Sequence, residues 1–400
     1  MNTIVEAAAG NAEQKGGSWR FMRKHMREYG MLLSLAAIMI FFQYMTDGTL
    51  LQPLNVTNLV LQNSYIVIMA LGMLLVIVAG HIDLSVGSVA GFVGALAAVL
   101  MVEYHWHFVP ATLVCLVVGG IIGGAQGYLI AFHKIPSFIV TLGGMLVFKG
   151  LALALLAGQS VGPFPPQFQL LSSGFIPDPI SGTEGLRATS LLIGAIIALG
   201  LFYAGVRERA NRNRYGAHTE PFTFFIGKSV VFAAMILYFS YLLSTYKGLP
   251  NVLVIMFALM LAFDFITNRT TLGRRIYAMG GNEKAARLSG IKTQWLSFYT
   301  FANMGVLAAL AGLVFAARLN TATPKAGLGF ELDVIAACFI GGASASGGVG
   351  KVMGAVIGAF VMGVMNNGMS ILGIGIDYQQ VIKGLVLIAA VFVDLYNKNK

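Results

Sequence analysis

Residues 57–79 read TNLVLQNSYIVIMALGMLLVIVA, an apolar run without a charged side chain. A helix needs about 20 such residues to cross the hydrocarbon layer of a bilayer, which is roughly 30 Å thick. Across the 400-residue chain, 57% of residues are apolar and only 10% are charged, whereas about 25% are charged in ordinary soluble domains. The run therefore predicts a transmembrane helix, and the composition excludes a soluble globular protein.

The same criterion divides the chain into about twelve apolar segments, so we predict an all-α polytopic membrane protein. The first segment follows a basic tail and lacks a small-residue cleavage pattern, which indicates an uncleaved span. The tenth is short and ends in the glycine-rich run 341–348, so it is either a complete span or a broken or re-entrant segment. The segments cover 30–46, 57–79, 84–102, 110–131, 137–157, 189–206, 229–246, 250–267, 295–318, 333–347, 352–373 and 379–395.

The basic residues test this count, because lysine and arginine concentrate in cytoplasmic loops. With the N-terminus inside, all but six of the 26 lysine and arginine residues fall in cytoplasmic segments. The net charge of +10 then reflects orientation and contact with anionic lipid rather than with nucleic acid. Both termini are expected in the cytoplasm. The expected parts are the tails 1–29 and 396–400, a transmembrane domain 30–395, and cytoplasmic loops at 207–228 and 268–293.

No complete motif for catalysis or nucleotide binding occurs in the sequence. Residues 222–229 end like a phosphate-binding loop, but Phe222 stands where its first glycine is needed. In residues 345–352, Ala345 replaces that glycine and Val352 replaces the final hydroxyl residue. Cys115 and Cys338 lie in apolar stretches without the spacing of a metal site or a disulfide. We therefore expect no catalytic residue, no metal ion and no cofactor in this chain, and an enzyme is disfavoured.

The segment 269–292, RTTLGRRIYAMGGNEKAARLSGIK, combines six basic residues with signals for a short helix. Gly281 and Asn282 belong to a turn, and Asn282 can cap a helix that begins at Glu283 and ends before Gly290. We interpret this helix as a docking element that lies across the inner face of the membrane. An ordinary basic loop is the alternative interpretation.

The surface of this short helix suits contact with another protein. Ala285 and Ala286 are predicted to leave a flat face that a partner can approach. Glu283 and Arg287 are four positions apart, so they can pair with each other or engage that partner.

Four stretches of the sequence together match a known pattern. They are GHIDLSVGSVAG from Gly80, IPSFIVTLGGMLVFKG from Ile135, TLGRRIYAMGGNEKAARLSGI from Thr271 and ELDVIAACFIGGASASGGVG from Glu331. Together they resemble the permease subunits of the carbohydrate-uptake-transporter-2 class of bacterial ABC importers, most closely the xylose and multiple-monosaccharide members. The likeness extends over about 47–394. Ribose-type members lack the stretch 187–247, which supplies an extra pair of spans, and xylose-type members carry a similar insertion.

The resemblance implies a type II-importer-like permease domain that works as a homodimer, a multi-pass protein of the bacterial inner membrane. Its partners would be two copies of a cytoplasmic ABC ATPase, or one tandem ATPase, that bind ATP and magnesium, and a periplasmic sugar-binding protein. The segment 283–290 would be the coupling helix that enters a groove on the ATPase. The chain would move a monosaccharide, such as xylose, from periplasm to cytoplasm by alternating access.

Charged side chains within the spans are candidates for the translocation path or its gate. Such groups cost about 2.5–3.5 kcal/mol at the centre of a bilayer on insertion scales, so they usually face protein or water. Asp83 and Ser85 lie at a break between the second and third spans, where Asp83 is either a helix cap or a gate residue. Lys149 lies well inside the fifth span. Lys383 lies near the outer part of the twelfth, where snorkelling to the interface suffices to explain it.

Neutral polar and aromatic groups are further candidates for the path. A monosaccharide offers hydroxyl groups and an apolar ring face but carries no charge. We therefore assign the amides of Asn303, Asn366 and Asn367 and the ring of Phe148 to the path. Each of them could instead form an interhelical hydrogen bond or a packing contact.

A proton-coupled secondary sugar transporter is the alternative function. Twelve spans with both ends inside, and the embedded Asp83 and Lys149, suit proton coupling. The predicted helix at 283–290 and its resemblance count against it, because a secondary transporter works without an ATPase. A channel or a structural scaffold has less support, since no ring-forming acidic run or filter sequence is visible.

Overall fold

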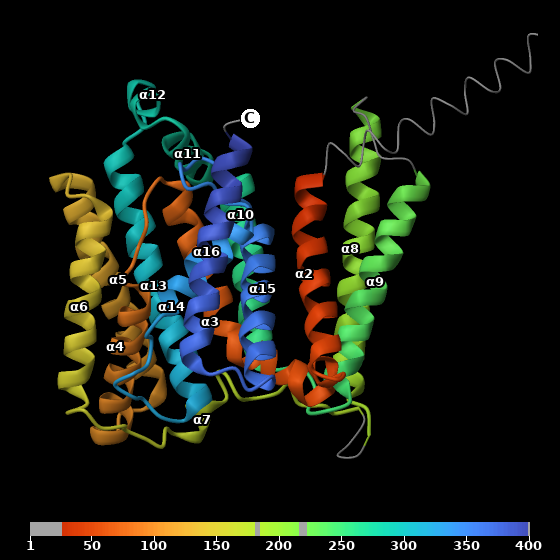
Figure 1. Ribbon diagram of the computed structural model, residues 1–400, viewed down its shortest axis with the longest axis horizontal. Helices are drawn as coiled ribbons and strands as arrows, with labels where there is room; N and C mark the ends of the chain where they lie inside the picture. Colours follow the sequence, from red (N-terminus) through yellow and green to blue (C-terminus); the bar gives the residue numbers. More distant parts are fainter. Residues whose placement is uncertain (1–25, 181–184, 216–221, 399–400) are drawn as a thin grey trace, which may run out of the picture. The chain divides into compact units, whose positions relative to one another are not determined.

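The computed structural model describes residues 26–180, 185–215 and 222–398, and these are mostly helical (Figure 1). Apart from two isolated bridges, the described residues contain no β-strand, which confirms the predicted all-α fold. The elements are α2 (Met26–Met45), η1 (Thr49–Leu51), α3 (Pro53–Val78), α4 (Val86–Ala98) with the π-helical end η2 (Val99–Glu103), α5 (Phe108–His133), α6 (Ser137–Leu155), α7 (Pro166–Gln169), α8 (Ala188–Arg214), α9 (Phe222–Ser244), α10 (Asn251–Arg269), α11 (Thr271–Gly281), α12 (Glu283–Leu288), α13 (Thr293–Leu319), α14 (Phe330–Ile340), α15 (Val352–Ile371) and α16 (Ile376–Lys398).

Within the described part of the chain, ten helices are long and apolar enough to cross a membrane. The other two predicted segments correspond to Gly30–Met45, a shorter apolar helix within α2, and to the short helix α14. The 11 residues of α14 extend about 17 Å at about 1.5 Å per residue, roughly half of a bilayer. The tenth segment is therefore not a complete helical span but a broken one. The ten long helices are α3, α4 with η2, α5, α6, α8, α9, α10, α13, α15 and α16.

The two predicted cytoplasmic loops are largely helical. The helix α8 continues to Arg214, so the basic run 207–214 forms its last turns rather than part of a loop. The segment 268–293 forms α11 and α12, where one short helix was expected. Of the predicted tails and loops, residues 1–25, 216–221 and 399–400 lie outside the described residues.

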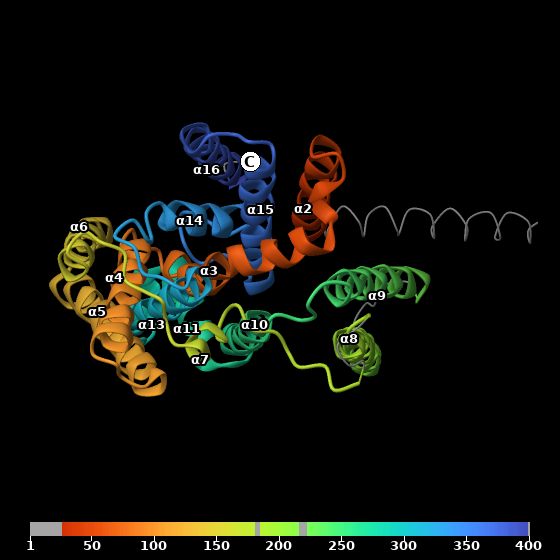
Figure 2. The same cartoon turned by 90° about the horizontal axis from the view of Figure 1, so that it is seen from below.

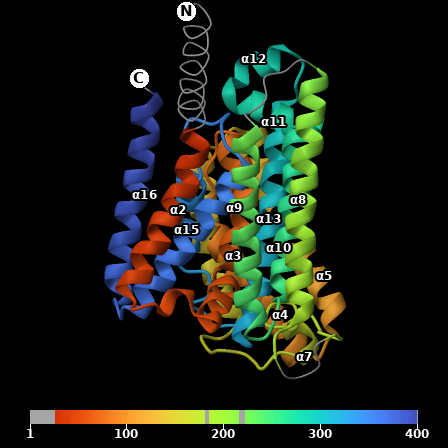
Figure 3. The same ribbon diagram turned by 90° about the vertical axis from the view of Figure 1, so that its right-hand side faces the viewer.

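The chain divides into two compact units, and α8 and α9 belong to the first. These two helices run side by side as a hairpin (Figures 2 and 3). Their contact is made where Gly194 faces the side chain of Ser240, and where the rings of Phe202 and Phe225 lie 6.1 Å apart. This hairpin is the extra pair of spans expected for 187–247. Of the described residues, the first unit contains 26–33, 52–54, 176–180, 185–215 and 222–249, and the second contains 34–51, 55–175 and 250–398.

The helix α13 is the central element of the second unit and packs against α5 and α4. Small residues let these backbones touch: a Cβ atom at Gly123 of α5 would overlap the Phe301 carbonyl oxygen of α13. In the same way, a Cβ at Gly312 of α13 would overlap the Ala90 carbonyl of α4. Gly119, Gly123 and Gly127 lie four apart on α5, a spacing that lets helix backbones approach closely, and all three face α13.

Three backbone segments meet at the end of the second unit that carries α11 and α12 (Figure 1). The Gly348 N–H donates to the Val78 carbonyl at the end of α3, with 2.8 Å between nitrogen and oxygen. A Cβ atom at Gly280, in the last turn of α11, would overlap the same carbonyl. We call Val78, Gly280 and Gly348 the backbone junction. It ties α11 to α3 and to the loop between α14 and α15.

We expect Gly280→Ala to lower the free energy of unfolding by about 1–3 kcal/mol, because the added methyl group overpacks the backbone junction. Gly281→Ala is the matched control on the neighbouring residue, since a Cβ there would meet nothing within 4 Å. Thermal unfolding of the two purified variants in the same detergent measures the difference. Equal midpoints for both variants would contradict the close approach at Gly280.

Candidate functional site

The helix α12 begins and ends as the sequence predicts. The Asn282 side chain accepts a hydrogen bond from the Ala285 N–H, with 3.0 Å between oxygen and nitrogen, and so caps the first turn. Gly290 has a φ of +82°, which favours glycine because it lacks a Cβ atom. The preceding helix α11 is capped in the same way by Thr270, whose hydroxyl accepts from the Gly273 N–H at 3.2 Å. Both helices therefore have defined starts.

The predicted flat alanine face of α12 is wrong. Ala286 is only 5% exposed and packs toward the protein, whereas Ala285 is exposed. Neighbouring residues of an α-helix are about 100° apart around its axis, so the two alanines point in different directions. The outward side chain that the sequence analysis missed is Leu288, which is 90% exposed. Leu288 comes two residues after Ala286, about 200° around the helix, so the sequence already placed the two side chains on opposite sides.

Glu283 is directed toward the membrane helices rather than toward Arg287. Its Oε1 lies 3.9 Å from Lys134 Nζ and accepts a hydrogen bond from the Thr293 hydroxyl at 3.2 Å. Lys134 follows α5 in a left-handed conformation and ends that helix. The first residue of α12 is therefore connected to the turn between α5 and α6 and to the start of α13, and Arg287 stays exposed.

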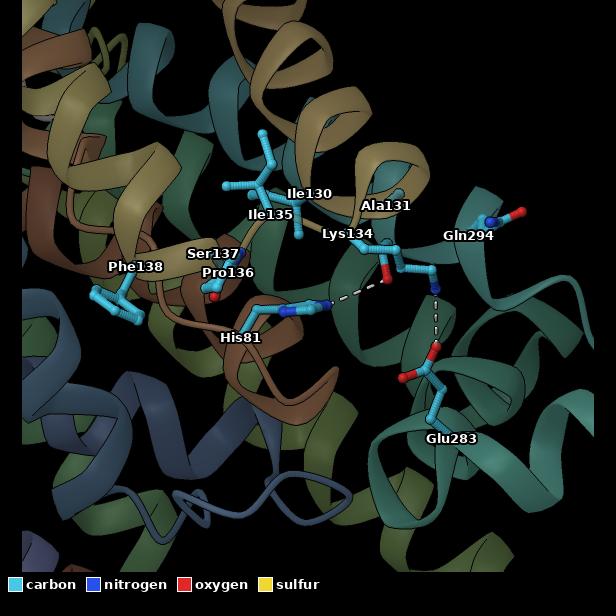
Figure 4. A pocket seen from close by; sticks show the side chains of 11 residues that line it. His81, Ile130, Ala131, Lys134, Ile135, Pro136, Ser137, Phe138, Glu283 and Gln294 are labelled. Carbon is cyan, nitrogen blue, oxygen red and sulfur yellow. Dashed lines mark hydrogen bonds and ion pairs between the residues drawn. The ribbon is translucent and has the colours of Figure 1, made fainter.

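A polar pocket of about 320 Å³ lies behind α12 (Figure 4). Lys134 and Glu283 reach toward each other on one side of it, and His81 points into it from the turn between α3 and α4. His81 Nε2 lies 3.3 Å from the Ser297 hydroxyl. Burial lowers the pKa of His81, an effect that nearby Glu283 opposes and Lys134 reinforces. The imidazole is therefore neutral at pH 7, and the charges of the pocket come from Lys134 and Glu283.

Asp83 and Ser85 form a second polar group, in the turn between α3 and α4. Asp83 Oδ1 accepts from the Ser85 N–H at 2.8 Å and from the Ser85 hydroxyl at 2.7 Å. The same hydroxyl lies 3.0 Å from the Gln126 amide on α5. One hydroxyl hydrogen cannot be donated to both acceptors, so the Gln126 amide is satisfied when its nitrogen faces Ser85. These bonds hold the turn before α4, but the N-cap of α4 is Ser85, and it has no side-chain capping bond, so Asp83 does not cap the helix directly.

A buried ion pair links the first turn of α14 to α16. Lys383 Nζ lies 3.0 Å from Asp333 Oδ1 and 3.1 Å from Oδ2, and the side chains are 17% and 3% exposed. The Asn366 amide donates to Asp333 Oδ2 at 3.2 Å, and the Tyr65 hydroxyl lies 3.4 Å away. Snorkelling is therefore the wrong account of Lys383. The sequence analysis missed Asp333, although it is a carboxylate within a predicted span.

The remaining predicted path residues do not join this ion pair. Asn367 forms a reciprocal amide pair with Asn55, at 2.9 and 3.1 Å, which is a structural contact. The Phe148 ring lies 5.5 Å from the Phe92 ring, and Lys149 next to it is exposed on α6. The buried amide nitrogen of Asn303 has no hydrogen-bond partner among the described residues. Of the predicted set, the structure therefore groups Asp83 with Ser85 and brings only Asn366 to the ion pair.

The chain is similar to known permeases over most of its length. A family model described as branched-chain amino acid transport system / permease component matches residues 55–391. The xylose transport system permease protein XylH of Escherichia coli strain K12 is 38% identical over 385 residues, which cover 96% of each chain. Its namesake from Haemophilus influenzae is 39% identical over 378 residues, 94% of this chain and 98% of that protein.

A second group of relatives is similar to the chain at lower identity and over less of its length. The ribose import permease protein RbsC of Escherichia coli strain K12 is 34% identical over 340 residues, which cover 85% of each chain. No solved structure is significantly similar to the chain.

We expect Lys383→Met to be strongly destabilising, because it leaves Asp333 buried without its counter-charge. Breaking a buried ion pair on one side costs about 3–5 kcal/mol, whereas replacing both partners by apolar residues is often neutral. The double variant Lys383→Met with Asp333→Leu should therefore recover most of the loss. Thermal unfolding in detergent checks both variants, and a double variant no more stable than the single one would contradict the pairing.

Asp83 should make stability depend on pH. Burial raises the pKa of its carboxyl to about 6 from 3.8, despite the two bonds from Ser85. Because the folded state holds the proton more tightly, Asp83 favours folding at low pH, and this contribution is lost as the pH rises from about 4 through about 6. The difference corresponds to about 3 kcal/mol.

Asp83→Asn is expected to flatten this pH dependence while its Oδ1 keeps both bonds to Ser85. Midpoints of thermal unfolding between pH 4.5 and 7.5 measure the slope, in steps of about half a pH unit. Asp264→Asn, at an exposed carboxylate of α10, is the control. An Asp83→Asn profile as steep as that of the unmodified protein would refute the assignment.

Proposed function

We infer the function from one premise: this chain belongs to the branched-chain amino acid transport system / permease component family, with xylose and ribose permeases among its relatives. It is a multi-pass protein of the bacterial inner membrane. On that premise it is the translocation subunit of an ATP-driven ABC importer. Its cargo is a monosaccharide, xylose or a related sugar, which it moves from periplasm to cytoplasm by alternating access.

The observation that carries this proposal is the construction of α12. It is a capped helix whose buried Ala286 fixes it to the second unit, while Leu288 and Arg287 remain outside. An exposed leucine next to Arg287 suits insertion into a groove of another protein, since removing its apolar surface from water is favourable. The sequence carries no phosphate-binding loop, so the ATPase is a separate chain, and ATP and magnesium belong to it.

The backbone junction supports a mechanical role for α12. Motion imposed on α12 passes to α11, and Gly280 of α11 is in direct backbone contact with the end of α3. The Glu283 contact with Lys134 provides a second connection, to the turn between α5 and α6. Packed backbones transmit a displacement because they cannot compress. The ATPase would thus tilt these helices and open the path to one side and then to the other.

The importer would contain further chains. We propose a homodimer of this subunit, two copies of a cytoplasmic ABC ATPase or one tandem ATPase, and a periplasmic sugar-binding protein. The binding protein sets which sugar is delivered, so the permease needs only a weakly polar path. A proton-coupled secondary transporter is disfavoured, because the relatives are named as import or transport-system permeases.

Proteoliposomes that contain this chain and the ATPase encoded beside it test the proposal. We expect ATP hydrolysis to rise when sugar-loaded binding protein is supplied, and only when this chain is present. Proton-dependent uptake of sugar by this chain alone, without stimulation of an ATPase, would establish the secondary transporter instead.

We expect Leu288→Ala to reduce this stimulation about tenfold or more, by loss of an anchor worth 1.4 kcal/mol or more at the interface. Leu385→Ala, at an exposed leucine of α16, is the matched control for loss of a surface side chain. Gly290→Val and Glu283→Lys should also uncouple transport, by straining the positive φ after α12 and by repelling Lys134. Normal stimulation in all three variants, with unchanged membrane insertion, would remove the case for α12 as the coupling element.

A further inference from the structure

The pocket behind α12 is lined by four parts of the chain that the proposed mechanism moves relative to one another. His81 comes from the turn between α3 and α4, Lys134 and Ser137 flank the turn between α5 and α6, Glu283 begins α12, and Gln294 lies in the first turn of α13 (Figure 4). Its volume of about 320 Å³ is at the small end of the range for small-molecule sites, about 300–1,000 Å³.

The polar groups of the pocket suit an uncharged ligand. Lys134 and Glu283 carry opposite charges and lie 3.9 Å apart, so the pocket has no net charge to attract an anion or a cation. In the part of the chain that the structure describes, the Gln294 amide and the Ser137 hydroxyl have no hydrogen-bond partner. Donors and acceptors thus stand side by side, which matches hydroxyl groups because each hydroxyl both donates and accepts.

The rest of the lining is apolar. Ile130, Ala131, Ile135 and Phe138 contribute to the wall on the side of α5 and α6. A monosaccharide has one face of C–H groups beside its hydroxyls, so a pocket with a polar side and an apolar side fits it better than it fits a fully hydrated ion.

We propose that this pocket binds a free monosaccharide from the cytoplasmic side and that its occupancy slows ATP-driven import. The proposal rests on the proposed importer function and adds a regulatory site to it. A sugar that bonds to Glu283 of α12, Ser137 of α6 and Gln294 of α13 would hold these elements in one arrangement. It would therefore resist the relative motion that each transport cycle requires.

Protection of an introduced cysteine tests binding in the complete transporter, with the ATPase present, in nanodiscs. Both native cysteines, Cys115 and Cys338, are buried, so the accessible thiol in this chain is that of Ile135→Cys, at a lining residue that supplies none of the polar groups of the pocket. We expect about 10 mM xylose to slow its labelling by a maleimide about threefold or more, as for a site with a dissociation constant of a few mM. The control is Asn268→Cys, an exposed residue outside the pocket, whose labelling should not change.

Two outcomes of the labelling experiment would overturn the proposal. Equal labelling of Ile135→Cys with and without xylose would show that the pocket does not bind the sugar. Protection by inorganic phosphate but not by xylose would show an anion site instead.

The regulatory effect is tested by ATP hydrolysis in proteoliposomes that enclose sugar-loaded binding protein and have the ATPase outside. We expect xylose added on the ATPase side to lower the stimulated rate about twofold or more, at about 10 mM. Gln294→Leu and Ser137→Ala should each weaken this inhibition. Two variants are used because either could affect folding.

The two proposals fail differently in this experiment. If the binding protein does not stimulate hydrolysis at all, the importer function fails. If it does stimulate hydrolysis, and xylose on the ATPase side leaves the rate unchanged or raises it, only the regulatory site is refuted.

Discussion

The contact between Val78, Gly280 and Gly348 constrains the whole end of the second unit that carries α12. The carbonyl at the end of α3 has no further helical turn to accept from, and the Gly348 N–H satisfies it. The Gly280 backbone presses against the same carbonyl, where a side chain would not fit. Because backbone touches backbone, α11 cannot shift without moving α3 or the loop after α14. Because α12 follows α11 directly, a displacement of α12 is coupled to the helices of the bundle.

Polar contacts, rather than apolar burial, attach α16 to this unit. None of the described side chains in its apolar span is fully buried, yet Lys383 and Asp394 both bond to the region of α14. Lys383 pairs with Asp333 in the first turn of α14, and Asp394 accepts from the Ser344 hydroxyl at 3.0 Å and the Ala345 N–H at 3.2 Å. In a lipid environment such contacts are costly to break, because the released groups find no water. The broken helix α14 and the loop after it are thus joined to α16 at two places, Lys383 and Asp394.

The ion pair between Asp333 and Lys383 and the backbone junction lie on either side of the break in the tenth segment. The ion pair fixes where α14 starts, and the backbone junction fixes the loop that follows it. An interrupted helix is tolerated in a membrane only where protein satisfies its free backbone groups. The same region therefore joins α11, which precedes α12, to the broken helix α14 and to the end of α3.

The sequence by itself determined the features that depend on neighbouring residues. The spans follow from runs of about 20 apolar residues, and the cap of α12 follows from Asn282 with Gly290 beyond its end. The close packing of α5 is indicated by its glycines, which are spaced four residues apart. Only the tertiary structure decided that Asp333 meets Lys383, that Ala286 faces inward, and that Lys134 meets Glu283 beside a pocket. These contacts join residues far apart in the chain, or depend on which side of a helix is covered, and no local pattern encodes either.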